Sequence, residues 1–302
     1  MSALEAQIFS DRLSSAYAHC EQIARQHYEN FPVASRLLPA AMRPHIAAIY
    51  AFARRADDFA DEPGFADADR LRLLDEWGQR LRGQTPVPHG GQTPGDTDEL
   101  IFHALGNTIR EHNLPIALFE DLLSAFRQDV VTTRYATWDD VLDYCRRSAN
   151  PVGRLVLRVA GYDDPQLDAR SDAVCTALQL TNFWQDLAID WSRGRLYVPL
   201  ADRDRAGAAE ADLDAGTLTR EWHAALRAVA ARTRELFDQG RPVCDAVRGR
   251  LRWELRLTWL GASRVLDRLD AIGFDVFHHR PSLTMSDAPA LVWQAIRWVP
   301  KP

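Results

Sequence analysis

The sequence contains few cysteines, and the four that it has lie far apart: Cys20, Cys145, Cys175 and Cys244. No Cys-x-x-Cys pair and no metal-ligand spacing is present. This pattern excludes a disulfide-rich scaffold or a zinc finger, and indicates reduced, mostly buried thiols in a cytosolic protein. Positive charge is not in excess either, because the net charge is −6. Electrostatics therefore give no support to a nucleic-acid partner.

Long apolar runs and phosphate-binding glycine loops are also missing. No stretch is long and apolar enough to span a bilayer. The N-terminal segment, MSALEAQIFSDRLSSAYAHC, lacks a basic region followed by an apolar run, so we expect no signal peptide and a cytoplasmic protein. Neither GxGxxG nor GxxxxGK[ST] occurs. Residues 288–299 are too short to span a membrane and are expected to pack on the body rather than lie on a membrane surface.

Alternating β-branched segments are absent, and helical periodicity covers most of the chain. The sequence therefore predicts an all-α fold, with helices at about 10–29, 40–61, 67–82, 98–112, 115–130, 138–160, 166–192, 217–239, 242–272 and 286–297. Proline and glycine interrupt the pattern in residues 83–97, GQTPVPHGGQTPGDT, which we interpret as a surface loop in a single domain covering residues 1–302. Residues 202–216 are a second candidate for a mobile segment.

One acidic motif stands out in ALQLTNFWQDLAIDWSRGRLYVP, residues 177–199. Asn182, Asp186 and Asp190 recur every four residues, which places them along one face of a helix. The positions between them are apolar, so these polar groups lie in a segment that is otherwise suited to burial. Carboxylates in such a place need a partner, and a divalent cation is the obvious one.

A second acidic motif lies upstream in YAFARRADDFADE, residues 50–62. Tyr50, Arg54, Asp57 and Asp61 have the spacing of one helical stripe. An arginine among carboxylates indicates an anionic ligand as well as a cation. Each motif alone is also typical of a solvated helix face with ion pairs four residues apart. The two motifs together favour a site for metal ions and a diphosphate, with the two acidic helices facing each other.

These two motifs, with YCRRSANPVGRL (residues 144–155) between them, resemble the squalene and phytoene synthase family from about residue 27 to residue 280. The resemblance implies an isoprenoid-synthase helical bundle around a central cavity, in which magnesium holds a prenyl diphosphate. It implies metal ligands at Asp57, Asp61, Asn182, Asp186 and Asp190, and diphosphate contacts from Tyr50, Arg54, Arg195 and Tyr197. Tyr144 matches a cavity tyrosine proposed to assist proton movement or to stabilise cations, although a buried tyrosine with a satisfied hydroxyl would look the same.

Three departures from the family pattern point to a branch. Gln185 and Ile189 replace the arginine and glutamate of the usual N-x-x-R-D-x-x-E-D. Residues 148–153, SANPVG, replace V-A-G-x-V-G, and Pro151 should kink the helix at Asn150. Residues 27–35 replace a serine-rich segment that grips diphosphate.

These variants resemble the hydroxysqualene synthase branch, which implies that presqualene diphosphate is ionised, rearranged and quenched by water. Asn150 and Tyr144 are the candidates to position that water. We expect a prenyl diphosphate as substrate, with two or three Mg²⁺ ions and without NADPH. We expect no nucleic-acid partner, but peripheral contact with a membrane. The sequence leaves the oligomeric state open. The alternatives are a synthase that condenses two prenyl diphosphates head to head, and a non-catalytic helical scaffold.

Overall fold

The computed structural model describes residues 3–26, 37–61, 64–83 and 97–299. In these ranges every named element is a helix, and strand-like pairing is confined to an isolated bridge between Arg134 and Leu196. The predicted all-α fold is confirmed. None of the described helices is long and apolar enough to cross a bilayer. Residues 84–96 and 27–36, on which the loop prediction and the serine-segment comparison depend, lie outside the described ranges.

The chain divides into two compact units. The first unit comprises residues 1–131 and 154–163, and the second comprises residues 132–153 and 164–302. The expectation of a single domain stays a prediction.

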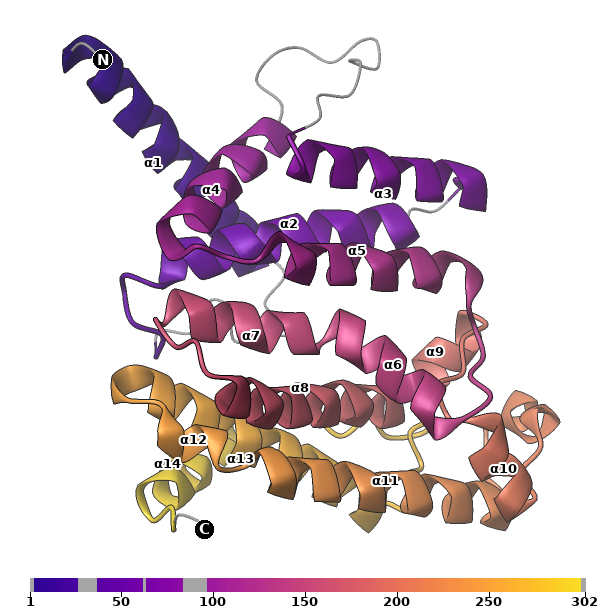
Figure 1. Ribbon diagram of the computed structural model, residues 1–302. Helices are drawn as coiled ribbons and strands as arrows, with labels where there is room; N and C mark the ends of the chain where they lie inside the picture. Colours follow the sequence, from indigo (N-terminus) through magenta and orange to yellow (C-terminus); the bar gives the residue numbers. More distant parts are fainter. Residues whose placement is uncertain (1–2, 27–36, 62–63, 84–96, 300–302) are drawn as a thin grey trace. The chain divides into compact units, whose positions relative to one another are not determined.

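The first unit is built around α2 (Arg43–Asp61), which packs against α1 (Ala3–Gln26), α3 (Asp67–Leu81), α4 (Thr97–His112) and α5 (Ile116–Val131). Figure 1 shows α2 running alongside α3 and α5. Small alanine side chains on α2 favour the helix and let its neighbours approach closely. Phe52 is fully buried, with Trp77 stacked at 5.6 Å and Phe119 edge-on at 5.5 Å between ring centroids. Phe52 is therefore an ordinary core residue.

The second unit is built around α8 (Pro165–Gln185). It packs against α6 (Trp138–Ser148), α11 (Arg220–Gly240), α12 (Val243–Ala246) and α13 (Gly249–Ala271), and α11 lies alongside it in Figure 1. Trp184 is fully buried, and its indole nitrogen donates to Thr233 Oγ1 on α11 at 2.9 Å. A helix that is covered on several sides is expected to carry apolar residues on more than one face. This burial explains the apolar positions around Asn182 at the end of α8.

Several predicted helices are divided in the structure. Residues 138–160 form α6 and α7 (Asn150–Val159), and Pro151 occupies the first turn of α7, so the predicted break is confirmed. The single helix expected at 166–192 is instead α8 followed by α9 (Leu187–Ser192), with a change of direction at Asp186. The helix expected at 242–272 is α12 and α13, and Gly249, the first residue of α13, has a φ of 63°.

The expectation that residues 202–216 are a mobile segment is wrong. They contain most of α10 (Leu200–Ala206) and the 3-10 helix η2 (Glu210–Ala215). The buried Asp202 forms an ion pair with Arg232 of α11 at 2.5 Å, and Glu210 pairs with Arg203 at 2.8 Å and with Arg134 at 2.9 Å. Ion pairs to other elements hold this charged sequence in place. The chain continues through η3 (Met285–Asp287) and ends, within the described ranges, after α14 (Ala288–Ile296).

Candidate active site

The first acidic motif occupies the last three turns of α2. Arg54 binds both neighbouring carboxylates, with Nη1 3.3 Å from Asp57 and Nη2 2.8 Å from Asp58. Asp58 was not among the predicted site residues, although its spacing of four from Arg54 could have indicated the pair. The Nε atom of Arg54 is buried and has no hydrogen-bond partner in the described structure. A buried guanidinium donor in this position suits an anionic ligand.

Tyr50 lies two turns before Asp57 on the same stripe and is partly buried. Burial raises the pKa of its hydroxyl above the usual value, and the positive charge of Arg54 only partly offsets this effect. Tyr50 therefore stays protonated and can donate a hydrogen bond to an anion. Asp61, at the end of α2, is exposed.

The second acidic motif crosses the junction of α8 and α9 without losing its helical spacing. The backbone N–H of Asp186 donates to the carbonyl of Asn182, and that of Asp190 donates to the carbonyl of Asp186, both at 2.8 Å. These two bonds continue the α-helical bonding pattern from Asn182 to Asp190. Residues four apart in that pattern project from the same side of the helix. All three side chains are partly exposed, so solvent or a ligand can reach them.

Arg195 and Tyr197 follow a tight turn at the end of α9. Gly194 has a φ of 76°, a conformation that glycine adopts without strain. The turn brings the N–H of Arg195 to the carbonyl of Asp190 at 2.8 Å, and the next N–H donates to Thr133 at 2.9 Å. The turn thus holds the backbone of Arg195 against the last residue of the second motif, and the diphosphate contact of its side chain stays a prediction.

Tyr197 belongs to a cluster of buried rings that also contains Tyr135, Tyr144 and Phe183. The rings of Phe183 and Tyr197 stack, with centroids 3.6 Å apart and an interplanar angle of 5°. Tyr144 lies 5.9 Å from Phe183 and 6.0 Å from Tyr197, and Tyr135 lies 5.5 Å from Tyr197. Ring faces of this kind stabilise a nearby cation. Tyr135 could not be identified from the sequence, because it lies outside every helical period.

Asn150 is buried at the start of α7, and its Oδ1 accepts from Thr176 Oγ1 of α8 at 2.9 Å. The contact depends on Gly153, because a Cβ there would lie 2.4 Å from Ser171 Oγ and 2.5 Å from Cys175 Sγ. Glycine lets the start of α7 approach α8. The side-chain carbonyl of Asn150 is therefore engaged by protein, which leaves its amide group as the part that could position a water.

The donor set of both motifs suits magnesium. The side chains offer carboxylate and amide oxygens, which are the ligands that Mg²⁺ prefers, and no thiol or imidazole belongs to either motif. Neither motif gathers three acidic side chains within 4.8 Å of one another in the described residues. Magnesium commonly takes one or two carboxylates and completes its shell with water and substrate phosphate, so this sparse set of ligands fits the ion.

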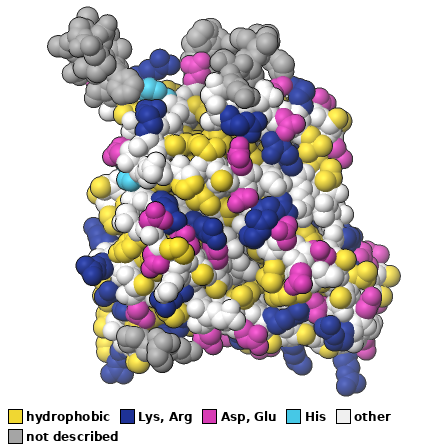
Figure 2. Space-filling model, in the orientation of Figure 1, with side chains coloured by type: hydrophobic (Ala, Val, Ile, Leu, Met, Phe, Trp, Pro, Cys, Tyr) yellow, Lys and Arg dark blue, Asp and Glu magenta, His cyan; other side chains and the backbone are white. Residues whose placement is uncertain are grey.

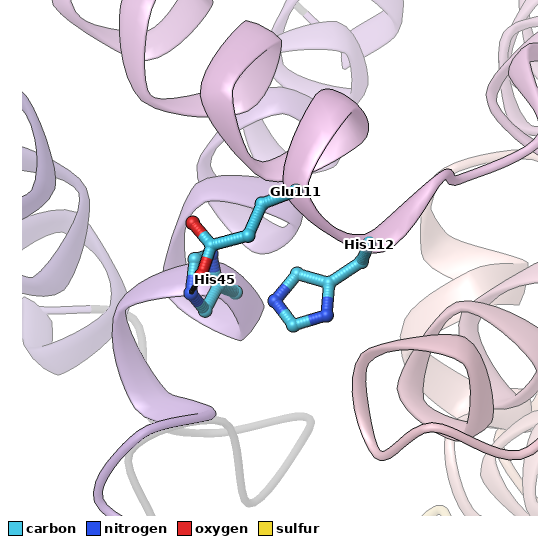
Figure 3. Close-up of side chains that lie close together, drawn as sticks. All are labelled: His45, Glu111 and His112. Carbon is cyan, nitrogen blue, oxygen red and sulfur yellow. Dashed lines mark ion pairs between the residues drawn. The ribbon is translucent and has the colours of Figure 1, made fainter.

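A different group of potential ligands does converge in the first unit: His45 of α2 with Glu111 and His112 of α4 (Figure 3). His45 Nε2 lies 3.7 Å from Glu111, and the two imidazoles meet edge-on at 4.4 Å. Burial, followed by the charge of His112, lowers the pKa of His45, which Glu111 opposes. Two imidazoles and a carboxylate suit a transition metal rather than magnesium. This group belongs to neither acidic motif.

The surface carries both signs of charge, and Figure 2 shows blue and magenta side chains interspersed on the face drawn. The arginines of the segment between the two motifs follow this pattern. Arg146 and Arg147 pair with Asp143 at 2.9 and 2.8 Å, and Arg158 pairs with Asp163 at 3.1 Å. Each of these three arginines is thus paired with an acidic side chain.

A helical protein that carries metal-compatible carboxylates, arginines and a cluster of buried aromatic rings has the features of an isoprenoid-diphosphate enzyme. A family model for squalene/phytoene synthase matches residues 24–287. The chain therefore belongs to the squalene/phytoene synthase family.

Individual relatives are consistent with this assignment. The chain is 40% identical to the hydroxysqualene synthase of Zymomonas mobilis over 70% of this chain and 68% of the relative. It is 36% identical to that of Rhodopseudomonas palustris (80% and 79%) and 30% identical to the phytoene synthase of Arthrospira platensis (88% of each). Among solved structures, squalene synthase HpnC from Alicyclobacillus acidocaldarius superposes with a TM-score of 0.77 and 38% identity, over 87% of this chain and 95% of that one.

Proposed function

We propose that this protein is a hydroxysqualene synthase, which converts presqualene diphosphate and water into hydroxysqualene, diphosphate and a proton. The observation that carries the proposal is the second acidic motif, in which Asn182, Asp186 and Asp190 keep their helical spacing while a buried glutamine occupies position 185. Relatives named as hydroxysqualene synthases support the choice of reaction.

In the proposed reaction, the C–O bond between the cyclopropylcarbinyl carbon and diphosphate breaks, and both electrons leave with the diphosphate. Arg54, Arg195 and the hydroxyl groups of Tyr50 and Tyr197 would bind the oxygens on which negative charge develops. Mg²⁺, held by Asp57, Asp61, Asn182, Asp186 and Asp190, would supply further neutralisation of that charge.

The carbocation that remains requires an environment without competing nucleophiles. The aromatic cluster of Tyr135, Tyr144, Phe183 and Tyr197 would stabilise it through the ring faces. After rearrangement one water attacks, forms the new C–O bond and loses a proton. We assign the orientation of this water to the amide of Asn150 and the hydroxyl of Tyr144. No reductant enters the reaction, because the oxygen of water ends the cation.

The test is to incubate the purified protein with Mg²⁺ and presqualene diphosphate, and to identify lipid products by mass spectrometry. Hydroxysqualene is expected, and Asp57→Asn and Asp186→Asn should each reduce its formation by at least 100-fold. Asp75→Asn is a matched control, because Asp75 is an acidic helix residue paired with Arg127 and belongs to neither motif. Equal activity of the motif variants and the control would contradict the site.

A head-to-head condensing synthase is the second candidate, favoured by the phytoene synthase relatives. That enzyme would use two prenyl diphosphates, so farnesyl diphosphate alone would give presqualene diphosphate. If neither substrate reacts, both reactions are rejected and the scaffold alternative gains support.

We also propose peripheral contact with a membrane, because the substrate is very apolar. α14 packs on α13 with Leu291 and Ala295 buried, as the sequence leads one to expect, but its other side leaves Val292, Trp293 and Ile296 each about half exposed. Flotation with liposomes should recover the protein, and Trp293→Glu with Ile296→Glu should abolish recovery. Leu200→Glu, at another exposed apolar position, is the control. Liposome recovery unchanged by the α14 variant would contradict this contact.

A further inference from the structure

The last residue of α8 and the residue after it contact two consecutive residues of the segment that connects α13 to η3. The side-chain amide of Gln185 donates through Nε2 to the carbonyl oxygen of Pro281. The next residue, Asp186, accepts through Oδ1 from Nε of Arg280 at 2.5 Å. The second acidic motif and this C-terminal segment are thus joined by a pair of adjacent contacts.

The two contacts differ in character. Gln185 is only 8% exposed, so its hydrogen bond is protected from water and fixes the backbone of Pro281. The ion pair is more open, because the side chain of Arg280 is 45% exposed and that of Asp186 is 27% exposed. Partly exposed ion pairs add little to folding stability, and their partners can be exchanged for an incoming ligand.

The segment on the other side of Arg280 is also anchored. Arg268 of α13 donates to the carbonyl of Ser282 at 2.6 Å and to Asp287 at 2.5 Å. Arg280 therefore projects from a short stretch that is fixed at Pro281 and Ser282. Its guanidinium is placed by the backbone rather than by its pairing with Asp186 alone.

We propose that Gln185 is a positioning residue: through the carbonyl of Pro281 it holds Arg280 at Asp186, where Arg280 binds the anionic end of the substrate. The inference rests on the proposed function and deepens it by naming a further diphosphate-binding residue and the residue that places it. Gln185 replaces an arginine of the usual family pattern, so a positive charge is absent at position 185. Arg280, 95 positions later in the chain, supplies a positive charge beside the same motif. Gln185 itself does not contact the substrate.

The experiment measures the affinity of the full chain for inorganic pyrophosphate in Mg²⁺ by isothermal titration calorimetry. Arg280→Ala should weaken binding about tenfold, and Gln185→Leu should weaken it several-fold. The double variant should bind no more weakly than Arg280→Ala, because Gln185 acts only through Arg280. Gln166→Leu, an exposed glutamine in the first turn of α8, and Arg250→Ala, an exposed arginine of α13, should bind as the parent does.

Two further variants separate positioning from a general loss of structure. Gln185→Asn keeps the amide but shortens the side chain, and Gln185→Glu keeps the length but removes the donor, so both should match Gln185→Leu. Thermal melts of every variant show whether it is folded, and if Gln185→Leu does not fold, Gln185→Asn takes its place in the cycle. Additive effects in the double variant, or unchanged affinity in Arg280→Ala, would overturn the inference.

The outcome is separable from that of the proposed function. Loss of pyrophosphate affinity in Arg280→Ala, in a chain that makes no hydroxysqualene, would reject the proposed reaction and keep the role of Gln185. Formation of hydroxysqualene with unchanged pyrophosphate affinity in Arg280→Ala would reject the role of Gln185 alone.

Discussion

Gly240, the last residue of α11, lies where that helix touches α8, and we predict that Gly240→Ala destabilises the second unit. The new Cβ would lie 2.5 Å from Val174 Cγ2, 2.6 Å from the carbonyl oxygen of Arg170 and 2.7 Å from the backbone nitrogen of Val174. Two of these three atoms are backbone, so a rotamer change cannot relieve the contact. α11 and α8 must move apart.

The cost follows from that separation. Opening a packed interface by about 0.5–1 Å forfeits roughly a quarter to a half of the dispersion energy of its contacts. Overpacked sites typically lose about 1–3 kcal/mol, and the backbone partners place this site toward the upper end. Alanine has a better helix propensity than glycine by about 1 kcal/mol in a helix interior, and this gain is smaller at a last residue. We expect a net loss of about 2 kcal/mol.

The assay is guanidinium chloride unfolding followed by far-ultraviolet circular dichroism. Gly106→Ala is the matched control, because its Cβ would meet only Arg110 Nη1 at 3.5 Å in the middle of α4. That variant should gain about 0.5–1 kcal/mol, as expected for replacing a helical glycine. If Gly240→Ala were as stable as the parent, the close approach of α11 to α8 would be refuted.

Further predictions concern buried polar groups and thiols. Thr176→Val should cost about 1–3 kcal/mol of unfolding free energy in a denaturant titration, because it leaves buried Asn150 without its donor; an unchanged midpoint would contradict that contact. Burial and the charge of His112 lower the pKa of His45 below 6.5, so the folded chain binds fewer protons than the unfolded chain, and unfolding free energy should fall as the pH drops below 6.5. His45→Gln should reduce this fall, and a pH dependence equal to that of the parent would contradict the assignment. Burial raises the pKa of the Cys20, Cys175 and Cys244 thiols to about 12; iodoacetamide at pH 8 should therefore leave the mass of the folded protein unchanged, and rapid alkylation would contradict their burial.

The sequence predicted the parts of the fold that local periodicity controls. α2 and α8 carry their polar stripes at helical spacing, and Pro151 marks the break between α6 and α7. The change of direction at Asp186 was not predicted, because the polar residues of the sequence keep a spacing of four across it. The backbone hydrogen bonds of Asp186 and Asp190 keep the same spacing in the structure.

Contacts between distant segments lay beyond the sequence. Tyr135 joins the aromatic cluster from an irregular segment, where its own carbonyl oxygen accepts from the backbone N–H of Leu200. No local sequence pattern marks this residue. The same holds for the meeting of His45 with Glu111 and His112, and for the bond from Gln185 to Pro281. Gln185 was identified as a departure from the family pattern, but its partner could be found only from tertiary structure.

The most direct test of the central claim is a paired incubation of the purified protein with Mg²⁺ and without NADPH. One sample receives farnesyl diphosphate, the other receives presqualene diphosphate, and lipid products are identified by mass spectrometry. We predict hydroxysqualene from the second sample and no condensation product from the first. Presqualene diphosphate from the first sample, or no product from either, would contradict the account.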